Sequence, residues 1–361
     1  MRTAVVHDWL NGMRGGEKVL EAMLPHLTDP TIFTLFHVPG SVSSAIERYP
    51  IRASYLNRFP LARRHYRNYL PLFPRAVEAF SLDGFDLVVS SSHCVAKGAV
   101  APPGVPHICY CHTPVRYAYD QFETYFPEGR TPLRRAKERA VAHLRAWDVA
   151  TANRPTRYLA NSTAVAQRIR RHYGREALVC HPPVDVEFFV PSDAPRGDFL
   201  LAVAALVPYK KLEDAVDASR LLGRELVVVG SGPEEKRLRA RAGSSVRFLR
   251  DVSGEDLREL YRTCAFFVQP GEEDFGIASV EAQACGAPIV ALARGGVLDV
   301  ADDASLGELY PEDGADALAA ALRAAGGRRF DYTAIARSAR RFARDRFDRE
   351  FGKEIEKALR P

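Results

Sequence analysis

Short apolar runs alternate with helical segments along most of the chain, in two successive series. The first series begins with TAVVHDW and GEKVLEAML and ends with RYLA and STAVAQRIRRHY. The second begins with DFLLAVAAL and reaches PIVALA. Apolar, β-branched runs that alternate with helices are typical of parallel sheets whose two faces are covered by helices. The sequence therefore predicts an α/β fold with two doubly wound domains.

A proline-rich segment separates the two series. HPPVDVEFFVPSDAPRG carries four prolines and few helical signals, so we place the linker near residues 182–196. We expect an N-terminal domain over residues 1–186 and a C-terminal domain over 187–344. A last helix, over about 345–361, is expected to pack back on the N-terminal domain. The length of 361 residues also favours two domains, at about 150 residues each.

The composition is that of an ordinary globular protein, with 47% apolar and 26% charged residues. The apolar runs are much shorter than the roughly 20 residues of a membrane-spanning helix, and the first residues lack the apolar segment of a signal peptide. We therefore expect a cytoplasmic protein. The six cysteines lie mostly within apolar runs, which favours reduced thiols over a disulfide framework.

Positive charge is concentrated in the first half of the chain. Residues 1–186 hold 24 Lys and Arg against 15 Asp and Glu, a net charge of +9, whereas residues 187–361 hold 26 against 30, a net charge of −4. No acidic residue lies between Glu47 and Glu78, where arginines alternate with aromatic residues. A solvated arginine-rich face would explain this segment, but it could also contact anionic lipid at the inner face of the cell membrane. The candidate residues for that contact are Arg63, Arg64 and Arg67.

Two candidate motifs of the first half follow predicted strands. Gly15 and Gly16 stand where the first strand gives way to a helix, and paired glycines let backbone N–H groups approach a phosphate there. His112 follows the strand HICYC, where a histidine can catalyse, cap or pack. Cys109 and Cys111 lack the spacing of zinc ligands, so we expect no metal at this motif.

Two further motifs lie in the second half. Lys210 and Lys211 follow its first strand, where an ammonium group would stabilise the negative charge of a leaving diphosphate. Glu273 and Glu281 flank the turn from a strand into a helix, and this spacing lets both carboxylates face one ligand. Exposed lysines are common, and acidic residues are also favoured in a first helical turn by the helix dipole.

Two other enzyme classes are disfavoured. Gly230 and Gly232 follow the strand ELVVV, but Glu235 stands at the third glycine position of a dinucleotide-binding motif, which argues against a nicotinamide oxidoreductase. The chain contains no Asp-x-Asp sequence, which argues against a transferase that holds its sugar nucleotide through a divalent metal. A non-catalytic protein that binds an anionic surface would explain the arginines but not the two glutamates.

Taken in order, the motifs resemble the retaining glycosyltransferases of family four. The resemblance runs from HDWLNGMRGGEKVL through CHTPVRYAYD, LVPYKK and VVGSGPEEKRL to EEDFGIASVEAQACGAPIVA, which is nearly the whole chain. It implies the GT-B fold, in which two Rossmann-like domains face each other across a cleft. HDWL, CHTPVRYAYD and VPYKK look most like the mannosyltransferases that build bacterial O-antigen, capsule and exopolysaccharide chains.

The resemblance also implies roles for individual residues. The catalytic residues would be His112 beside the donor sugar, Lys210 at the diphosphate and Glu273 at the sugar hydroxyls. Glu281 would bind the ribose of the donor, and further contacts to the donor would come from Gly15, Gly16, Lys211, Phe275, Gly276 and Ile277. One position departs from the family, because Ala205 stands where an arginine usually assists the lysine.

The expected reaction transfers a hexose from a nucleoside diphosphate sugar to a hydroxyl of a glycan or lipid-linked acceptor, with retention at the anomeric carbon. The resemblance favours GDP-mannose as the donor, and a UDP-linked sugar is the alternative. We expect no cofactor, no metal and no nucleic acid partner.

Overall fold

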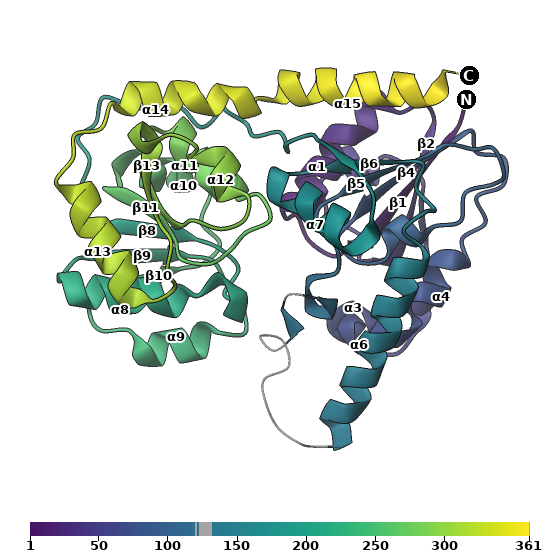
Figure 1. Cartoon of the computed structure of the whole chain (residues 1–361), viewed down its shortest axis with the longest axis horizontal. Coiled ribbons are helices and arrows are strands. Elements are labelled where there is room, and N and C mark those ends of the chain that lie inside the picture. The colour runs from purple at the N-terminus through teal and green to yellow at the C-terminus, as the bar shows by residue number, and fades with distance from the viewer. Residues whose placement is uncertain (120, 123–131, 361) are drawn as a thin grey trace. The chain divides into compact units, whose positions relative to one another are not determined.

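The computed structural model describes residues 1–119, 121–122 and 132–360 (Figure 1). The chain divides into two compact units. Unit 1 comprises Met1–His181 and Phe347–Pro361, and unit 2 comprises Pro182–Arg346. The boundary at residues 181 and 182 lies at the start of the proline-rich segment.

Unit 1 is built on a parallel sheet, which has seven strands within the described residues and the order β3-β2-β1-β4-β5-β6-β7. The strands are β1 (Thr3–Leu10), β2 (Pro30–His37), β3 (Ile51–Ala53), β4 (Leu87–Ser92), β5 (His107–Cys111), β6 (Arg157–Ala160) and β7 (Ala177–Val179). The α-helices are α1 (Gly15–Met23), α2 (Ser44–Glu47), α3 (Ala62–His65), α4 (Phe73–Glu78), α6 (Pro132–Ala150), α7 (Thr163–Tyr173) and, from Phe347 on, α15 (Arg344–Leu359). Short 3₁₀ helices are η1 (Leu24–His26), η2 (Tyr55–Arg58), η3 (Tyr66–Leu72), η4 (Ala96–Gly98) and η5 (Arg116–Ala118).

Unit 2 contains a second parallel sheet, with six strands among the described residues and the order β10-β9-β8-β11-β12-β13. The strands are β8 (Leu200–Val203), β9 (Leu226–Val229), β10 (Val246–Leu249), β11 (Phe266–Gln269), β12 (Ile289–Leu292) and β13 (Gly307–Tyr310). The α-helices are α8 (Leu212–Leu222), α9 (Glu235–Arg241), α10 (Gly254–Thr263), α11 (Ile277–Ala284), α12 (Val297–Val300), α13 (Ala315–Gly326) and α14 (Tyr332–Ala339). The 3₁₀ helices are η6 (Pro208–Lys210), η7 (Ala304–Leu306) and η8 (Arg340–Phe342).

Both sheets start in a central strand and are extended first to one side and then to the other. The direction reverses between β1 and β4 in unit 1 and between β8 and β11 in unit 2. Open parallel sheets bind ligands beyond the carboxyl ends of their strands at such a reversal. The predicted α/β fold with two Rossmann-like domains is confirmed, and the strand order shows where each domain offers a site.

Burial explains why the apolar runs form strands. Every residue of β4 and of β9 is buried, as expected for central strands with helices on both faces. Polar caps start several helices: Ser162 accepts a hydrogen bond from the backbone N–H of Val165, and Ser253 does the same for Asp256. Such caps satisfy backbone donors that the first helical turn leaves open.

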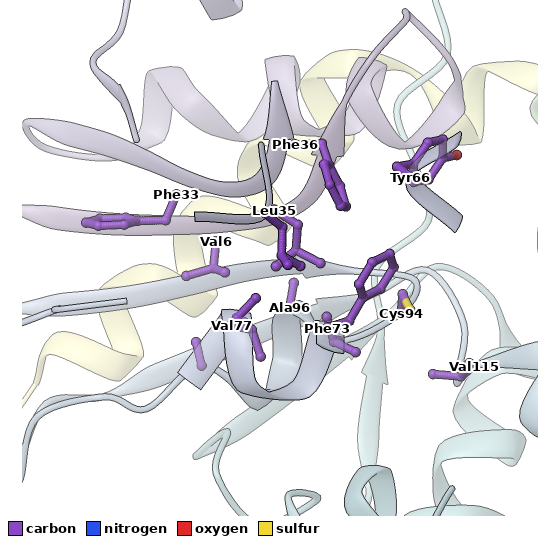
Figure 2. Packing of buried hydrophobic residues seen from close by; sticks show 14 of the residues in the cluster. Val6, Phe33, Leu35, Phe36, Tyr66, Phe73, Val77, Cys94, Ala96 and Val115 are labelled. Carbon is purple, nitrogen blue, oxygen red and sulfur yellow. The ribbon is translucent and has the colours of Figure 1, made fainter. Parts of the chain in front are cut away.

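The arginine-rich segment of unit 1 contributes to a hydrophobic core as well as to the surface. Figure 2 shows Phe36, Tyr66 and Phe73 in that core. The ring centroid of Phe36 lies 5.6 Å from that of Tyr66 and 5.5 Å from that of Phe73. Tyr66 and Phe73 are 4% and 1% exposed. These two aromatic residues of the segment therefore belong to the core rather than to a surface that could contact lipid, because the core needs their apolar area.

Other residues of the same segment do lie at the surface. Tyr55 and Leu61 are exposed, and Leu61 exposes 70% of its area. Arg67 is also exposed, with its guanidinium 4.8 Å from the centre of the Tyr66 ring. Arg63 and Arg64 belong to α3, but their side chains lie outside the part of the chain that the structure describes.

The last helix, α15, packs on unit 1. Phe347, Phe351 and Ile355, spaced by four residues, are buried together in a hydrophobic core of that unit. Asp348 lies 2.8 Å from Nε2 of His26, and Glu354 pairs with Arg157 of β6. The four-residue spacing places one apolar face of the helix on the unit, which fixes the end of the chain there.

In the described ranges, no helix has the length and apolar character needed to cross a membrane. All six cysteines are buried free thiols.

Candidate functional site

The carboxyl edge of the unit 1 sheet carries several polar side chains around the reversal in strand order. His7 and Asp8 lie near the end of β1, Ser91 lies near the end of β4, and His112 directly follows β5. Because β1, β4 and β5 are neighbours in a parallel sheet, these residues from distant parts of the sequence meet at one edge.

Direct contacts connect three of these side chains, His7, Ser91 and His112, in a row with a fourth, Glu17. Oε1 of Glu17, in the first turn of α1, lies 3.7 Å from Nε2 of His7. Nδ1 of His7 lies 3.0 Å from Oγ of Ser91, and the same Oγ lies 2.9 Å from Nε2 of His112. The predicted site residue His112 is therefore connected to a buried carboxylate through a serine and a second histidine.

Asp8 organises the loop after β4. Its carboxylate accepts four backbone hydrogen bonds of 2.7–2.9 Å from the consecutive N–H groups of residues 93–96. Its Oδ2 also lies 3.3 Å from Nδ1 of His93. Hydrogen bonds to a carboxylate are stronger than those between neutral groups, so four of them hold the loop firmly. Asp8 thus fixes the loop that carries His93, whose ring centroid lies 6.2 Å from that of His112.

The local environment shifts two pKa values in this cluster. Burial raises the pKa of the Glu17 carboxyl, but the nearby imidazoles of His7 and His93 outweigh it, so the pKa lies below its usual value. Burial lowers the pKa of His93, and the nearby Asp8 offsets only part of that effect. Glu17 is therefore held as a carboxylate.

Gly15 and Gly16 begin α1, as the strand-to-helix motif predicts. A Cβ added to Gly16 would lie 3.8 Å from Cε1 of His7 and 3.9 Å from Nε2 of His112. The first N–H groups of α1 therefore lie in the same place as the histidine cluster. Backbone N–H groups at a helix start suit an anionic ligand.

In unit 2, Lys210 and Glu273 form an ion pair. Nζ of Lys210 lies 2.5 Å from Oε1 of Glu273, with the two side chains 13% and 18% exposed. Lys210 follows β8 and Glu273 follows β11, the two neighbouring strands at the reversal. Gly271 lets their loops meet, because a Cβ there would lie 2.4 Å from the carbonyl oxygen of Tyr209. A small pocket lies at this edge, lined in part by Lys210, Gln269 and Glu273.

The other predicted residues of this edge have different neighbours. Glu281 lies on α11, is 5% exposed and accepts a 3.1 Å hydrogen bond from the hydroxyl of Tyr261. Gly276 precedes α11 with a φ of 94°, in the left-handed region that favours glycine. Ile277 starts the helix, while the Phe275 side chain is buried, so only its backbone is a candidate for ligand contact.

Lys211 faces away from the pair formed by its neighbour. Its Nζ lies 2.7 Å from Oδ1 of Asp313, and the Arg294 guanidinium lies 3.1 Å from Oδ2 of the same carboxylate. Burial raises the pKa of Asp313, but these two cations outweigh it and bring that pKa below its usual value. The structure thus separates the partners of Lys210 and Lys211.

The glycines after β9 have a structural explanation. A Cβ at Gly230 would lie 2.0 Å from the carbonyl oxygen of Ala204, and one at Gly232 would lie 2.3 Å from that of Leu206. Both glycines permit close contact between the loops that follow β8 and β9. Their presence therefore needs no dinucleotide ligand.

Sequence reasoning gave no individual role to several residues of the two edges, although His7 and Asp8 belong to the HDWL motif. Ser91 and His93 lie at the end of LVVSSSHC, and Asp8 and His7 lie at the end of TAVVHDW. Polar residues at the end of a strand that is buried on both faces were the available signal, because burial needs compensating hydrogen bonds. Tyr261 offered no comparable signal, since it lies within a regular amphipathic helix.

In the part of the chain that the structure describes, no group of three or more His, Cys, Asp or Glu side chains could hold a metal ion. The two edges offer positive charge, helix N-termini and carboxylates. Such groups bind phosphates and hydroxyl-rich ligands.

Family models match both units. The model described as "Glycosyltransferase Family 4" matches residues 13–188, and that described as "Glycosyl transferases group 1" matches residues 185–340. Curated relatives include the D-inositol 3-phosphate glycosyltransferases of Streptomyces bingchenggensis, 32% identical over 189 residues, and Geodermatophilus obscurus, 35% identical over 207 residues. These alignments cover 43% and 48% of this chain and 42% and 46% of the relatives. The match thus spans less than half of the length of either relative.

Solved structures with the same fold cover almost the whole chain. HepE of Anabaena in complex with UDP has a TM-score of 0.71 at 18% identity, with 99% of each chain covered. WaaG, a glycosyltransferase involved in lipopolysaccharide biosynthesis, has a TM-score of 0.67 at 18% identity, again with 99% of each chain covered. These structures confirm the predicted GT-B fold.

Proposed function

The chain belongs to the family-four glycosyltransferases, whose two domain models together match residues 13–340, and we propose that it is a retaining hexosyltransferase. It moves a hexose from a nucleoside diphosphate sugar to a hydroxyl of a glycan or lipid-linked acceptor. The observation that carries this proposal is the Lys210–Glu273 ion pair at the carboxyl edge of the unit 2 sheet. It supplies one cation for a diphosphate and one carboxylate for sugar hydroxyls.

Each proposed role follows from the chemistry of a side chain. Lys210 neutralises the charge that develops on the departing diphosphate, and Glu273 accepts hydrogen bonds from hydroxyls of the sugar. Glu281, held by Tyr261, binds the ribose. The backbone N–H groups after Phe275 and at the start of α11 contact the donor. In unit 1, His112 acts on the donor sugar, and the start of α1 at Gly15 and Gly16 contacts the phosphates.

The reaction proceeds by attack of the acceptor hydroxyl on the same face that the diphosphate leaves. The departing phosphate oxygen accepts the proton of that hydroxyl, so the bond to the acceptor forms as the bond to the phosphate breaks. Fixed positive charge supplies most of the reduction of the barrier. No metal takes part, and we expect activity to persist in excess EDTA. Loss of activity in EDTA with rescue by manganese or magnesium would contradict this mechanism.

We propose GDP-mannose as the donor, on the basis of the HDWL, CHTPVRYAYD and VPYKK motifs. A UDP-linked hexose is the second candidate, because the HepE structures of the same fold contain UDP and UDP-glucose. A thermal-shift panel of GDP, UDP, ADP and their sugars separates the two, since a ligand that binds the native state raises its melting temperature. A shift with GDP and GDP-mannose supports our first choice. A shift with UDP ligands alone overturns it, and no shift with any of them contradicts the proposed activity.

We also propose that unit 1 binds the inner face of the cell membrane peripherally, where a lipid-linked acceptor would lie. The basic excess of residues 1–186 and the exposed Tyr55 and Leu61 support this proposal. Replacement of Arg63, Arg64 and Arg67 by Glu together should abolish salt-sensitive cosedimentation with anionic vesicles and leave nucleotide affinity unchanged. Equally weak binding of the native chain to anionic and neutral vesicles would exclude this mode of attachment.

A further inference from the structure

The hydroxyl group of Ser91 couples two imidazole rings. Its Oγ lies 3.0 Å from Nδ1 of His7 and 2.9 Å from Nε2 of His112, and Ser91 is fully buried. A serine hydroxyl has one proton, so it can donate to only one of the two ring nitrogens. For both short contacts to be hydrogen bonds, the other ring nitrogen must carry its own proton and donate it to Ser91. The protonation of one ring therefore determines that of the other.

Glu17 sets the direction of this chain of hydrogen bonds. Its Oε1 lies 3.7 Å from Nε2 of His7, and the two side chains are 4% and 0% exposed. A buried carboxylate favours a proton on the nitrogen that faces it. A neutral His7 with its proton on Nε2 has an unprotonated Nδ1, to which Ser91 donates. The oxygen of Ser91 then accepts a hydrogen bond from Nε2 of His112.

We propose that Ser91, His7 and Glu17 are positioning residues that keep a proton on Nε2 of His112 and fix the plane of its ring. This inference deepens the proposed function and rests on it, because it gives His112 a defined state beside the donor sugar. In the neutral ring, a proton on Nε2 leaves Nδ1 unprotonated. The hydrogen-bonding character that the ring offers to the sugar is thus determined by Glu17, two side chains away.

Other neighbours of His112 are consistent with a fixed ring. The ring of Tyr110 is arranged edge-on at a centroid distance of 5.2 Å, and that of His93 at 6.2 Å. The backbone N–H of His112 donates a 2.8 Å hydrogen bond to the carbonyl of Ser92. Backbone and ring contacts therefore restrict the position of the side chain, while Ser91 selects its tautomer.

Nitrogen NMR of the imidazole rings tests the proposal in the free protein, without donor or acceptor. The full chain is labelled with ¹⁵N-histidine, and the His112 signals are assigned by their absence in His112→Gln. We expect the wild-type ring to be protonated on Nε2. Ser91→Ala and Glu17→Gln should each move the ring toward protonation on Nδ1 or toward a mixture of tautomers, because the first removes the bridge and the second the carboxylate.

Ser92→Ala is the matched control. Ser92 lies next to Ser91 on β4, is also buried, and uses its hydroxyl oxygen to accept a hydrogen bond from the backbone N–H of Lys97 rather than from a histidine. This variant should keep the wild-type tautomer. A wild-type His112 protonated on Nδ1 would overturn the proposal, and so would a His112 tautomer that is unchanged in both Ser91→Ala and Glu17→Gln.

Kinetic measurements on the same variants separate this inference from the proposed function. Ser91→Ala and Glu17→Gln should lower kcat about tenfold or more, the size of effect known for partners that orient metal-bound histidines. They should leave the affinity for nucleoside diphosphate close to that of the wild type. A changed tautomer with full kcat would uphold the relay and refute the role of His112. Reduced kcat with an unchanged tautomer would refute the relay instead.

Discussion

Lys210 and Glu273 neutralise each other, with Nζ of the lysine 2.5 Å from Oε1 of the glutamate. The cation proposed for the diphosphate and the carboxylate proposed for the sugar are therefore in direct contact. A bound diphosphate must share or replace Glu273 as the partner of Lys210. Glu273 thus opposes donor binding because it competes for Lys210, whereas the rate of transfer benefits from its carboxylate at the sugar.

Lys210→Ala should lower turnover by roughly 10²-fold or more, the loss expected when one fixed charge-stabilising group is removed from a transition state. Ala205 leaves the position of the usual assisting arginine without charge, so little else compensates. Lys211→Ala is the control, because Lys211 pairs with Asp313 instead. Steady-state kinetics of both variants provide the measurement. Near wild-type turnover in Lys210→Ala combined with a large loss in Lys211→Ala would place the diphosphate at the other lysine.

The two glutamates should affect different parameters. Glu281→Ala should weaken binding of the nucleoside diphosphate, since this residue is proposed to bind the ribose. Glu273→Gln should lower kcat without weakening nucleoside diphosphate binding, because it removes the carboxylate that competes for Lys210. Calorimetric titration with the diphosphate and kinetics with its sugar separate these effects. Equal losses of nucleotide affinity in the two variants would contradict the assignment.

The positions of the predicted site residues could be found from the sequence, but most of their partners could not. Apolar runs mark where strands end, so His112, Lys210 and Glu273 were expected at the carboxyl edges, and the structure has them there. The partners depend on strand order, which no local pattern encodes. His7 and Ser91 are 84 residues apart and meet only because β1 and β4 are neighbours.

Backbone conformation accounts for another part of what the sequence left open. Lys210 and Lys211 are adjacent and chemically alike, so the sequence assigned both of them to the donor. Lys211 has a φ of 49° and starts α8 from a left-handed conformation, which a pattern of residue types does not specify. Its side chain is therefore near Asp313, while that of Lys210 is near Glu273.

Lys97 and Asp148 form a buried ion pair in unit 1 whose loss should destabilise that unit. Nζ of Lys97 lies 3.0 Å from Oδ1 of Asp148 and 2.7 Å from its carbonyl oxygen, and both side chains are almost completely buried. Lys97→Met leaves the carboxylate without its cation, at a cost of about 3–5 kcal/mol in the free energy of unfolding. Lys353→Met, at an exposed position of α15, should change it little.

Tryptophan fluorescence during urea unfolding measures this effect, because both tryptophans of the chain, Trp9 and Trp147, belong to unit 1. A midpoint of unfolding in Lys97→Met equal to that of Lys353→Met would show that the buried pair contributes nothing to stability.

Acid should destabilise unit 1 through His107. Its side chain is buried, with Nε2 2.8 Å from Oγ of Ser90, and burial together with the charges of Lys97 and Arg154 lowers its pKa to about 3. In the unfolded chain the pKa of a histidine is about 6.5. Between these two values the unfolded chain binds a proton that the folded unit does not, so the free energy of unfolding falls as the pH falls.

Urea unfolding followed by tryptophan fluorescence at about pH 7.5 and about pH 5 tests this expectation, because the carboxylates of Glu17 and Glu354, whose pKa values lie below the usual range, stay charged at both values. His107→Gln should reduce the loss of stability between the two conditions, and His143→Gln, at an exposed position of α6, should not. Some pH dependence will persist in His107→Gln, since burial also lowers the pKa of His93. A loss of stability as large in His107→Gln as in the wild type would show that His107 is protonated to the same extent in the folded and unfolded chains.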